Sequence, residues 1–135
     1  MLRVLLGAIC FVVIGMLVLV ALTPFRGHAR ARHIEALTEI ASIKVALAAF
    51  RNDAGFYPTG TDGLLDLVRQ PPGATNWRGP YLQRTNLPLD PWARHYIYRC
   101  PGGHSAEGYP YDVLSLGQPG KNKPIANWAY PALRP

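Results

Sequence analysis

The pattern of hydrophobic and polar residues divides the chain into an apolar segment, an amphipathic segment and a turn-rich remainder. The apolar segment, Leu2–Leu22, contains one charged residue, Arg3. As a helix rising about 1.5 Å per residue it would be about 31 Å long, which matches the hydrocarbon core of a bilayer. We therefore expect residues 1–23 to form a transmembrane helix. A cleaved signal peptide is the alternative, but the apolar run is longer than a signal sequence requires.

Beyond the junction at residues 23–27, apolar positions recur at helical spacing over about residues 28–54. At about 100° per residue they fall on two strips of one helix. The first strip comprises Ile40, Ile43, Leu47 and Phe50. The second strip comprises Ile34, Leu37, Ala41, Val45 and Ala48. Such a helix can bury one strip in its own domain and offer the other to neighbouring molecules. The alternative is a single broad core face with Lys44 at its edge.

Proline and glycine recur at short intervals through the rest of the chain and predict turns between short helices and strands. Gly55 is suited to a left-handed cap that ends the long helix. We expect a short helix at about 61–70, capped by Thr61 or Asp62, whose apolar stripe packs on the long helix. That stripe comprises Leu64, Leu67 and Val68. Residues 71–93 read as an ordered loop, in which Trp77, Tyr81 and Trp92 are better explained as core residues than as a ligand platform.

In the last third of the chain, apolar and polar residues alternate as they do along β-strands. His95–Cys100 and Tyr109–Leu116 predict an antiparallel pair, and Ile125–Trp128 predicts a last short strand. We therefore expect a small β-sheet over about residues 94–128. A long helix followed by an antiparallel sheet places the protein in the α+β class.

Charge and candidate chemistry exclude several functions. The net charge of +6 comes from arginines and lysines that are spread singly, so no nucleic-acid partner is expected. Arg26, Arg30 and Arg32 are placed to meet lipid headgroups. The possible parts of a catalytic triad are His95, His104, Asp112 and Ser115. No nucleophile elbow or phosphate-binding glycine loop accompanies them, and His28 and His33 are poorly spaced for one metal. We expect no enzyme and no cofactor.

A series of short motifs carries the most specific signal. In chain order they are FRNDAGFYPT at 50–59, TDGLLDLV at 61–68, NWRGPYL at 76–82, LPLDPW at 87–92, YIY at 96–98, PGGH at 101–104, YDVLSLG at 111–117 and IANW at 125–128. In this order and at these spacings, residues 24–128 closely resemble the major pseudopilins of the bacterial type II secretion system. The resemblance implies a pilin fold, in which a long amino-terminal helix packs against a small antiparallel sheet.

The resemblance also implies a function and a location. Such proteins polymerise into a periplasmic filament that helps to export folded proteins across the outer membrane. We therefore expect residues 24–135 to form a periplasmic domain, anchored in the inner membrane by residues 1–23. The expected partners are further copies of the chain, other pseudopilins, the inner-membrane secretion platform and the membrane itself. The arginines that follow the apolar segment outnumber Arg3, and that count alone would favour the opposite topology.

Within this interpretation each strip of the helix receives a role. We assign the second strip, from Ile34 to Ala48, to contacts between subunits. We assign the first strip, from Ile40 to Phe50, to the domain core. We expect three tryptophans to complete that core: Trp77, Trp92 and Trp128.

The sequence departs from the family pattern in two places. Pilin precursors carry a basic leader ending in glycine and a glutamate near the start of the mature helix, whereas Leu2–Leu22 contains no acidic residue. We expect either a misplaced start codon or an unprocessed, divergent relative. The second departure lies in the family's calcium loop, which is degenerate here around Ser115, Gln118, Pro119 and Pro124. Because calcium requires carboxylate ligands and this loop carries two lysines instead, we expect no metal site.

Two other functions stay open. A membrane-anchored accessory protein could keep the pilin fold without polymerising, and the missing acidic residue favours it. A DNA-binding pilin relative is the second alternative, although the scattered basic residues argue against it.

Overall fold

The computed structural model describes residues 2–60, 62–83 and 86–129, without the side chains of residues 1–10 and 19–26. The chain divides into two units, Met1–Arg32 and His33–Pro135. The helix α1, Leu2–Ala54, runs through both. The predicted junction at residues 23–27 is therefore helical.

The first unit consists of the amino-terminal part of α1. Its described apolar side chains are exposed, for example Phe11 at 82%. Among the residues that the structure describes, no helix is both long enough and apolar enough to span a membrane. For much of the predicted span Leu2–Leu22, at residues 2–10 and 19–22, the side chains are not described.

In the second unit, α1 ends where the sequence predicts. Gly55 has a φ of +83°, and its amide donates a hydrogen bond of 2.8 Å to the carbonyl of Arg51. A left-handed residue after the last turn satisfies a carbonyl that the helix would otherwise leave without a partner, and glycine adopts it without steric cost. The chain then leaves the helix through Pro58, which is buried.

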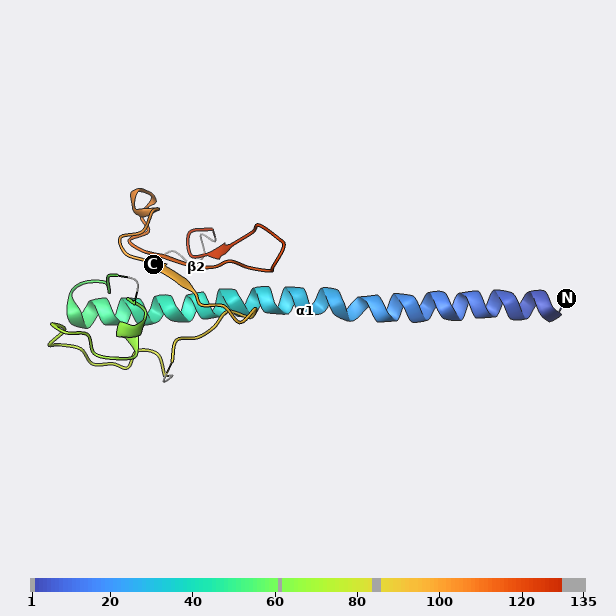
Figure 1. The fold of residues 1–135 in the computed structure, drawn as a ribbon, viewed down its shortest axis with the longest axis horizontal. Helices are drawn as coiled ribbons and strands as arrows, with labels where there is room; N and C mark the ends of the chain where they lie inside the picture. Colours follow the sequence, from blue (N-terminus) through green and yellow to red (C-terminus); the bar gives the residue numbers. More distant parts are fainter. Residues whose placement is uncertain (1, 61, 84–85, 130–135) are drawn as a thin grey trace. The chain divides into compact units, whose positions relative to one another are not determined.

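The sheet has three short antiparallel strands in the order β1-β2-β3. They are β1 (Ile97–Arg99), β2 (Asp112–Ser115) and β3 (Ile125–Ala126). Tyr98 pairs with Val113, and Leu114 pairs with Ala126. The sheet lies along the part of α1 that belongs to the second unit (Figure 1). The predicted pairing is confirmed, but the strands are shorter than expected, because Pro101 and Pro110 have no amide to add to the ladder.

The short helix expected at 61–70 is reduced to a single 3-10 turn, η1 (Leu65–Leu67). The amide of Leu67 donates to the carbonyl of Leu64 at 3.2 Å, three residues back. The helix is cut short because Pro71 and Pro72 follow closely, and a residue before proline avoids the helical conformation.

The predicted caps of that helix have different outcomes. Thr61 lies outside the described residues, and no side chain caps η1, whose first flanking residue is Leu64. Asp62 contributes its backbone carbonyl instead, which accepts from the amide of Leu65 at 2.7 Å. The predicted apolar stripe is confirmed, since Leu64 and Leu67 are buried and Val68 packs against the core.

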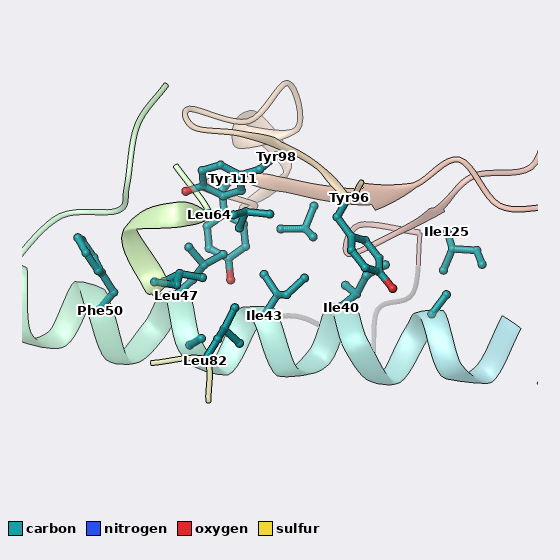
Figure 2. Close-up of a cluster of buried hydrophobic side chains, with 14 of the residues drawn as sticks. Ile40, Ile43, Leu47, Phe50, Leu64, Leu82, Tyr96, Tyr98, Tyr111 and Ile125 are labelled. Atoms are coloured by element: carbon teal, nitrogen blue, oxygen red, sulfur yellow. The ribbon is translucent and has the colours of Figure 1, made fainter. Parts of the chain in front are cut away.

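The core lies between α1 and the elements that cover it (Figure 2). Ile40, Ile43, Leu47 and Phe50, the whole first strip, are fully buried. In Figure 2 these α1 side chains lie opposite Tyr96, Tyr98, Tyr111 and Ile125, which come from the elements that cover the helix. Burial raises the pKa of both Tyr98 and Tyr111. Tyr98 remains satisfied because its hydroxyl donates to the carbonyl of Pro58 at 2.8 Å.

The loop at 71–93 is irregular, as expected, and its aromatic residues dock it onto the core. Trp77 and Trp92 are half-buried and pack against the core. The indole of Trp77 donates to the carbonyl of Asp66 at 2.9 Å. The hydroxyl of Tyr81 donates to the carboxylate of Asp53 at 2.8 Å, which ties the loop to the last turn of α1.

Trp128 differs from the expectation. It is half-buried, lies outside the core cluster, and stacks on the ring of His104 with their centres 3.9 Å apart. Trp128 lies just after β3, and its partner His104 lies in the loop that connects β1 to β2.

Candidate assembly surface

The second strip of α1 remains largely uncovered. Ile34 is 54% exposed, Val45 is 71% exposed and Ala48 is exposed, while Ala41 is half-buried. Leu37 is the exception, because it packs against the core although it is not fully covered. It lies three residues before Ile40, so the two side chains share one edge of the helix. Leu37 therefore contributes to the domain core, and its role in assembly stays a prediction.

The same helix thus carries two apolar faces with different environments. One face is fully buried in the domain, and the other presents large aliphatic side chains beside the exposed polar residues Glu35, Thr38 and Ser42. Exposed aliphatic residues aligned on one face of a helix mark an interaction surface, whereas isolated ones do not. The alternative of a single broad core face does not describe this helix.

Lys44 lies between the two faces and is buried, with an exposed fraction of 9%. Burial lowers the pKa of its ammonium group, because the charged form loses hydration. Across the described ranges no acidic side chain forms an ion pair with it. Lys44 is therefore a largely buried side chain without an ion pair, and only a small part of it reaches water at the edge of the core.

A second group of polar side chains joins the loop at 71–93 to the sheet. The carboxylate of Asp90 is its centre and is buried. It accepts hydrogen bonds from the hydroxyl of Ser115 at 2.6 Å and from the backbone amides of Trp92 and Arg94 at 3.0 and 2.9 Å. The guanidinium of Arg94 adds an ion pair at 3.3 Å. Every contact here favours the charged carboxylate.

These contacts decide the ionisation of Asp90. Burial alone would raise its pKa, but the hydrogen bonds from Ser115 and from the two amides, together with the charge of Arg94, outweigh burial and lower the pKa below its ordinary value. Sequence reasoning missed both Asp90 and Arg94. A signal was available in Asp90-Pro91, because aspartate before proline commonly opens a turn in which the carboxylate accepts backbone amides.

Arg94 also reaches the loop between β2 and β3, residues 116–124. The same nitrogen, Nη2, that meets Asp90 also donates to the carbonyl of Gly117. The amide of Gly117 donates to the hydroxyl of Ser115 at 3.0 Å. Gly117 has a φ of +73°, and a Cβ there would lie 2.4 Å from the carbonyl oxygen of Lys123. Only glycine allows the two ends of this loop to approach so closely.

The residues of this loop do not fit a calcium ion. Gln118, Pro119, Lys121, Lys123 and Pro124 are all exposed, and residues 116–124 include no carboxylate. The Ser115 hydroxyl and the Gly117 carbonyl, which could serve as oxygen ligands, are already engaged by Asp90 and Arg94. Calcium requires six to eight oxygen ligands with carboxylates among them, and this set supplies too few.

The possible triad residues do not come together. His104 Nδ1 lies 3.1 Å from the carboxylate of Asp112, but Ser115 bonds to Asp90 instead. His95 is exposed, and its backbone forms an isolated bridge with Leu89. A base and an acid without a nucleophile within reach do not form a catalytic triad. The described residues also contain no group of three or more potential metal ligands, and Cys100 is a free thiol.

A long helix that buries one apolar face under a small antiparallel sheet, and leaves a second one open, defines a pilin-like structural protein. A family model, type II secretion system protein G, matches residues 25–127. The chain belongs to this family.

Several known proteins are similar to the chain. The type II secretion system core protein G of Escherichia coli K12 is 34% identical over 128 residues, which covers 89% of this chain and 84% of the relative. The protein of the same name from Xanthomonas campestris pv. campestris is 35% identical over 114 residues, covering 84% and 74%. A crystal structure of the major pseudopilin of enterohaemorrhagic Escherichia coli matches with a TM-score of 0.63 at 27% identity. It covers 78% of this chain and 94% of that one. The predicted family and fold class are confirmed.

Proposed function

We propose that the protein is a structural subunit of a type II secretion pseudopilus and that the second strip of α1 is a contact surface between subunits. Family membership supports the first part. One observation carries the second: Ile34 and Val45 are more than half exposed on a helix whose opposite face is fully buried. The proposed strip comprises Ile34, Leu37, Ala41, Val45 and Ala48, of which Leu37 also packs against the core.

The geometry of the strip suits a polymer. The strip lies on a side of α1 that the sheet leaves uncovered, so a second copy that packs on it with a different surface of its own would form a contact between unlike surfaces. Contacts between unlike surfaces repeat without closing, and they generate a filament when the rotation does not form a ring. Covering a valine or isoleucine side chain fully contributes about 1.5–3 kcal/mol, so each half-exposed residue offers about 1 kcal/mol.

The location follows from the proposed function. Residues 1–23 would anchor the chain in the inner membrane, with residues 24–135 in the periplasm. The apolar run Leu2–Leu22 supports this anchor by its composition. Arg26, Arg30 and Arg32 would lie at the lipid headgroups. The partners would then be further copies of the chain, other pseudopilins and the inner-membrane secretion platform.

The test is a charge placed on the strip. Val45→Asp in the full chain should reduce cross-linked multimers in membranes at least tenfold, because a carboxylate would be buried at each contact. Thermal unfolding of the detergent-solubilised variant should stay close to that of the parent. Asn76→Asp, which adds the same charge at an exposed polar position outside α1, is the matched control and should leave multimers unchanged.

Two results would contradict the proposal. Multimers at the parental level in Val45→Asp would show that the strip is not a contact surface. An equal loss in Asn76→Asp would show that an added charge prevents assembly wherever it lies on the domain. Leu37→Asp should lower multimers and the unfolding temperature together, since Leu37 also packs on the core.

A further inference from the structure

We propose that the guanidinium of Arg94 is the cation that holds the loop between β2 and β3 closed, so that this loop needs no divalent metal. The starting observation is a single side chain that contacts a carboxylate in one loop and a carbonyl in another. Arg94 Nη2 donates both to Asp90 and to Gly117.

A tight turn places the arginine at this point. The amide of Ala93 donates to the carbonyl of Asp90 at 2.9 Å, and the amide of Asp90 donates to the carbonyl of Arg94 at 2.7 Å. Ala93 takes a left-handed conformation, with a φ of +61°. The guanidinium also lies over the ring of Trp92, 5.9 Å from its centre. The side chain is therefore positioned before it meets the loop, and it loses little freedom on closure.

The loop is organised around the carbonyl that Arg94 contacts. Gly117 lies against the carbonyl of Lys123 at the far end of the loop. Between them, the amide of Lys121 donates to Gln118 at 3.1 Å, and the amide of Lys123 donates to Lys121 at 2.7 Å. Fixing the Gly117 carbonyl therefore fixes the start of a compact loop whose end is already in contact with it.

The chemistry of the contact resembles that of a bound metal. A divalent cation closes a loop by gathering carboxylate and carbonyl oxygens, and Arg94 gathers one of each through charge-assisted hydrogen bonds. Arginine keeps its charge at every accessible pH, and its planar fork fixes the directions of its donors. Lys121 and Lys123 lie in the same loop, and their positive charges oppose a second cation there.

The experiment compares loop opening in the full chain purified in detergent. Trypsin cleavage after Lys121, followed by mass spectrometry, reports opening of the loop. Arg94→Gln should be cut at least tenfold faster than the parent, while Arg69→Gln, a change at an exposed arginine outside this cluster, should be cut at the parental rate. The parental rate and unfolding temperature should be the same in 1 mM calcium chloride and in excess EDTA.

Two outcomes overturn the proposal. The first is cleavage of Arg94→Gln at the rate of the Arg69→Gln control. The second is slower cleavage, or a clear rise in the unfolding temperature, when calcium is added to the parent. If Arg94→Gln does not fold, Arg94→Lys replaces it and should be cut at least threefold faster than the control, since an ammonium lacks the planar fork. The calcium comparison needs no variant and decides the metal question alone.

Discussion

Replacing Lys44 by methionine should stabilise the protein, because methionine keeps the apolar stem of the side chain and removes a charge that burial disfavours. Lys44 is 9% exposed and forms no ion pair across the described ranges. Burying a polar group without compensation costs about 1–3 kcal/mol in proteins. Since a small part of the side chain still reaches water, we expect a gain of about 1–2 kcal/mol at pH 7, or roughly 5–10 °C in the unfolding temperature.

The pH dependence of this gain has a definite sign. Burial lowers the pKa of Lys44 in the folded protein, so between the folded and unfolded values the unfolded chain binds more protons. Stability of the parent should therefore rise with pH in that window, which ends near the ordinary lysine pKa of about 10.4. The advantage of Lys44→Met should be full at pH 7 and should shrink as the pH approaches 10.

The assay is thermal unfolding of the full chain in detergent, followed by circular dichroism at several pH values from 7 to 10. Lys121→Met is the matched control, because Lys121 is exposed. That change should stay within about 0.5 kcal/mol of the parent at every pH. The reasoning is refuted if Lys44→Met lowers the unfolding temperature at pH 7, or if its advantage does not change with pH.

Three further predictions concern the core, the loop and the acid limit of stability. Ile43→Ala should cost about 2–4 kcal/mol in thermal unfolding, because Ile43 is fully buried and a cavity remains; a loss below 1 kcal/mol would contradict its place in the core. Gly117→Ala should cost about 2 kcal/mol or more, since the new Cβ would meet the carbonyl of Lys123, whereas Gly120→Ala, with the same sign of φ but open space, should cost about 1 kcal/mol. The lowered pKa of Asp90 contributes stability above the ordinary aspartate pKa of about 3.9 that is lost as the pH falls through the folded value, so Asp90→Asn should flatten the acid limb of a stability–pH curve. An unchanged acid limb would assign that loss to other carboxylates.

The helical and apolar patterns of the sequence were sufficient to locate the main elements. The periodicity at 28–54 separated residues that became buried, such as Ile43, from residues that stayed exposed, such as Val45. Gly55 marked the end of α1, and alternation at 94–128 marked the three strands. These features follow from spacing along one element, which is a local property that the sequence displays directly.

Short elements were predicted less well. The helix expected at 61–70 became the single turn η1, because the two prolines that follow outweighed its apolar stripe. Leu37 was assigned to one strip although it packs on the core, since residues at the edge of a helical face can belong to either side. Trp128 was assigned to the core, but its ring stacks on His104, a contact between residues of different loops that spacing along one element does not show.

The sequence by itself determined the α+β class, the two faces of the long helix, the family and the absence of carboxylates from the loop between β2 and β3. The tertiary structure alone decided which distant residues meet. Arg94 and Gly117 are 23 positions apart, Asp90 lies still earlier in the chain, and no periodicity relates the three. Their contact exists because the turn at Ala93 and the end of β2 lie side by side in the folded domain. Only that packing brings the guanidinium of Arg94 to a loop that contains no acidic residue.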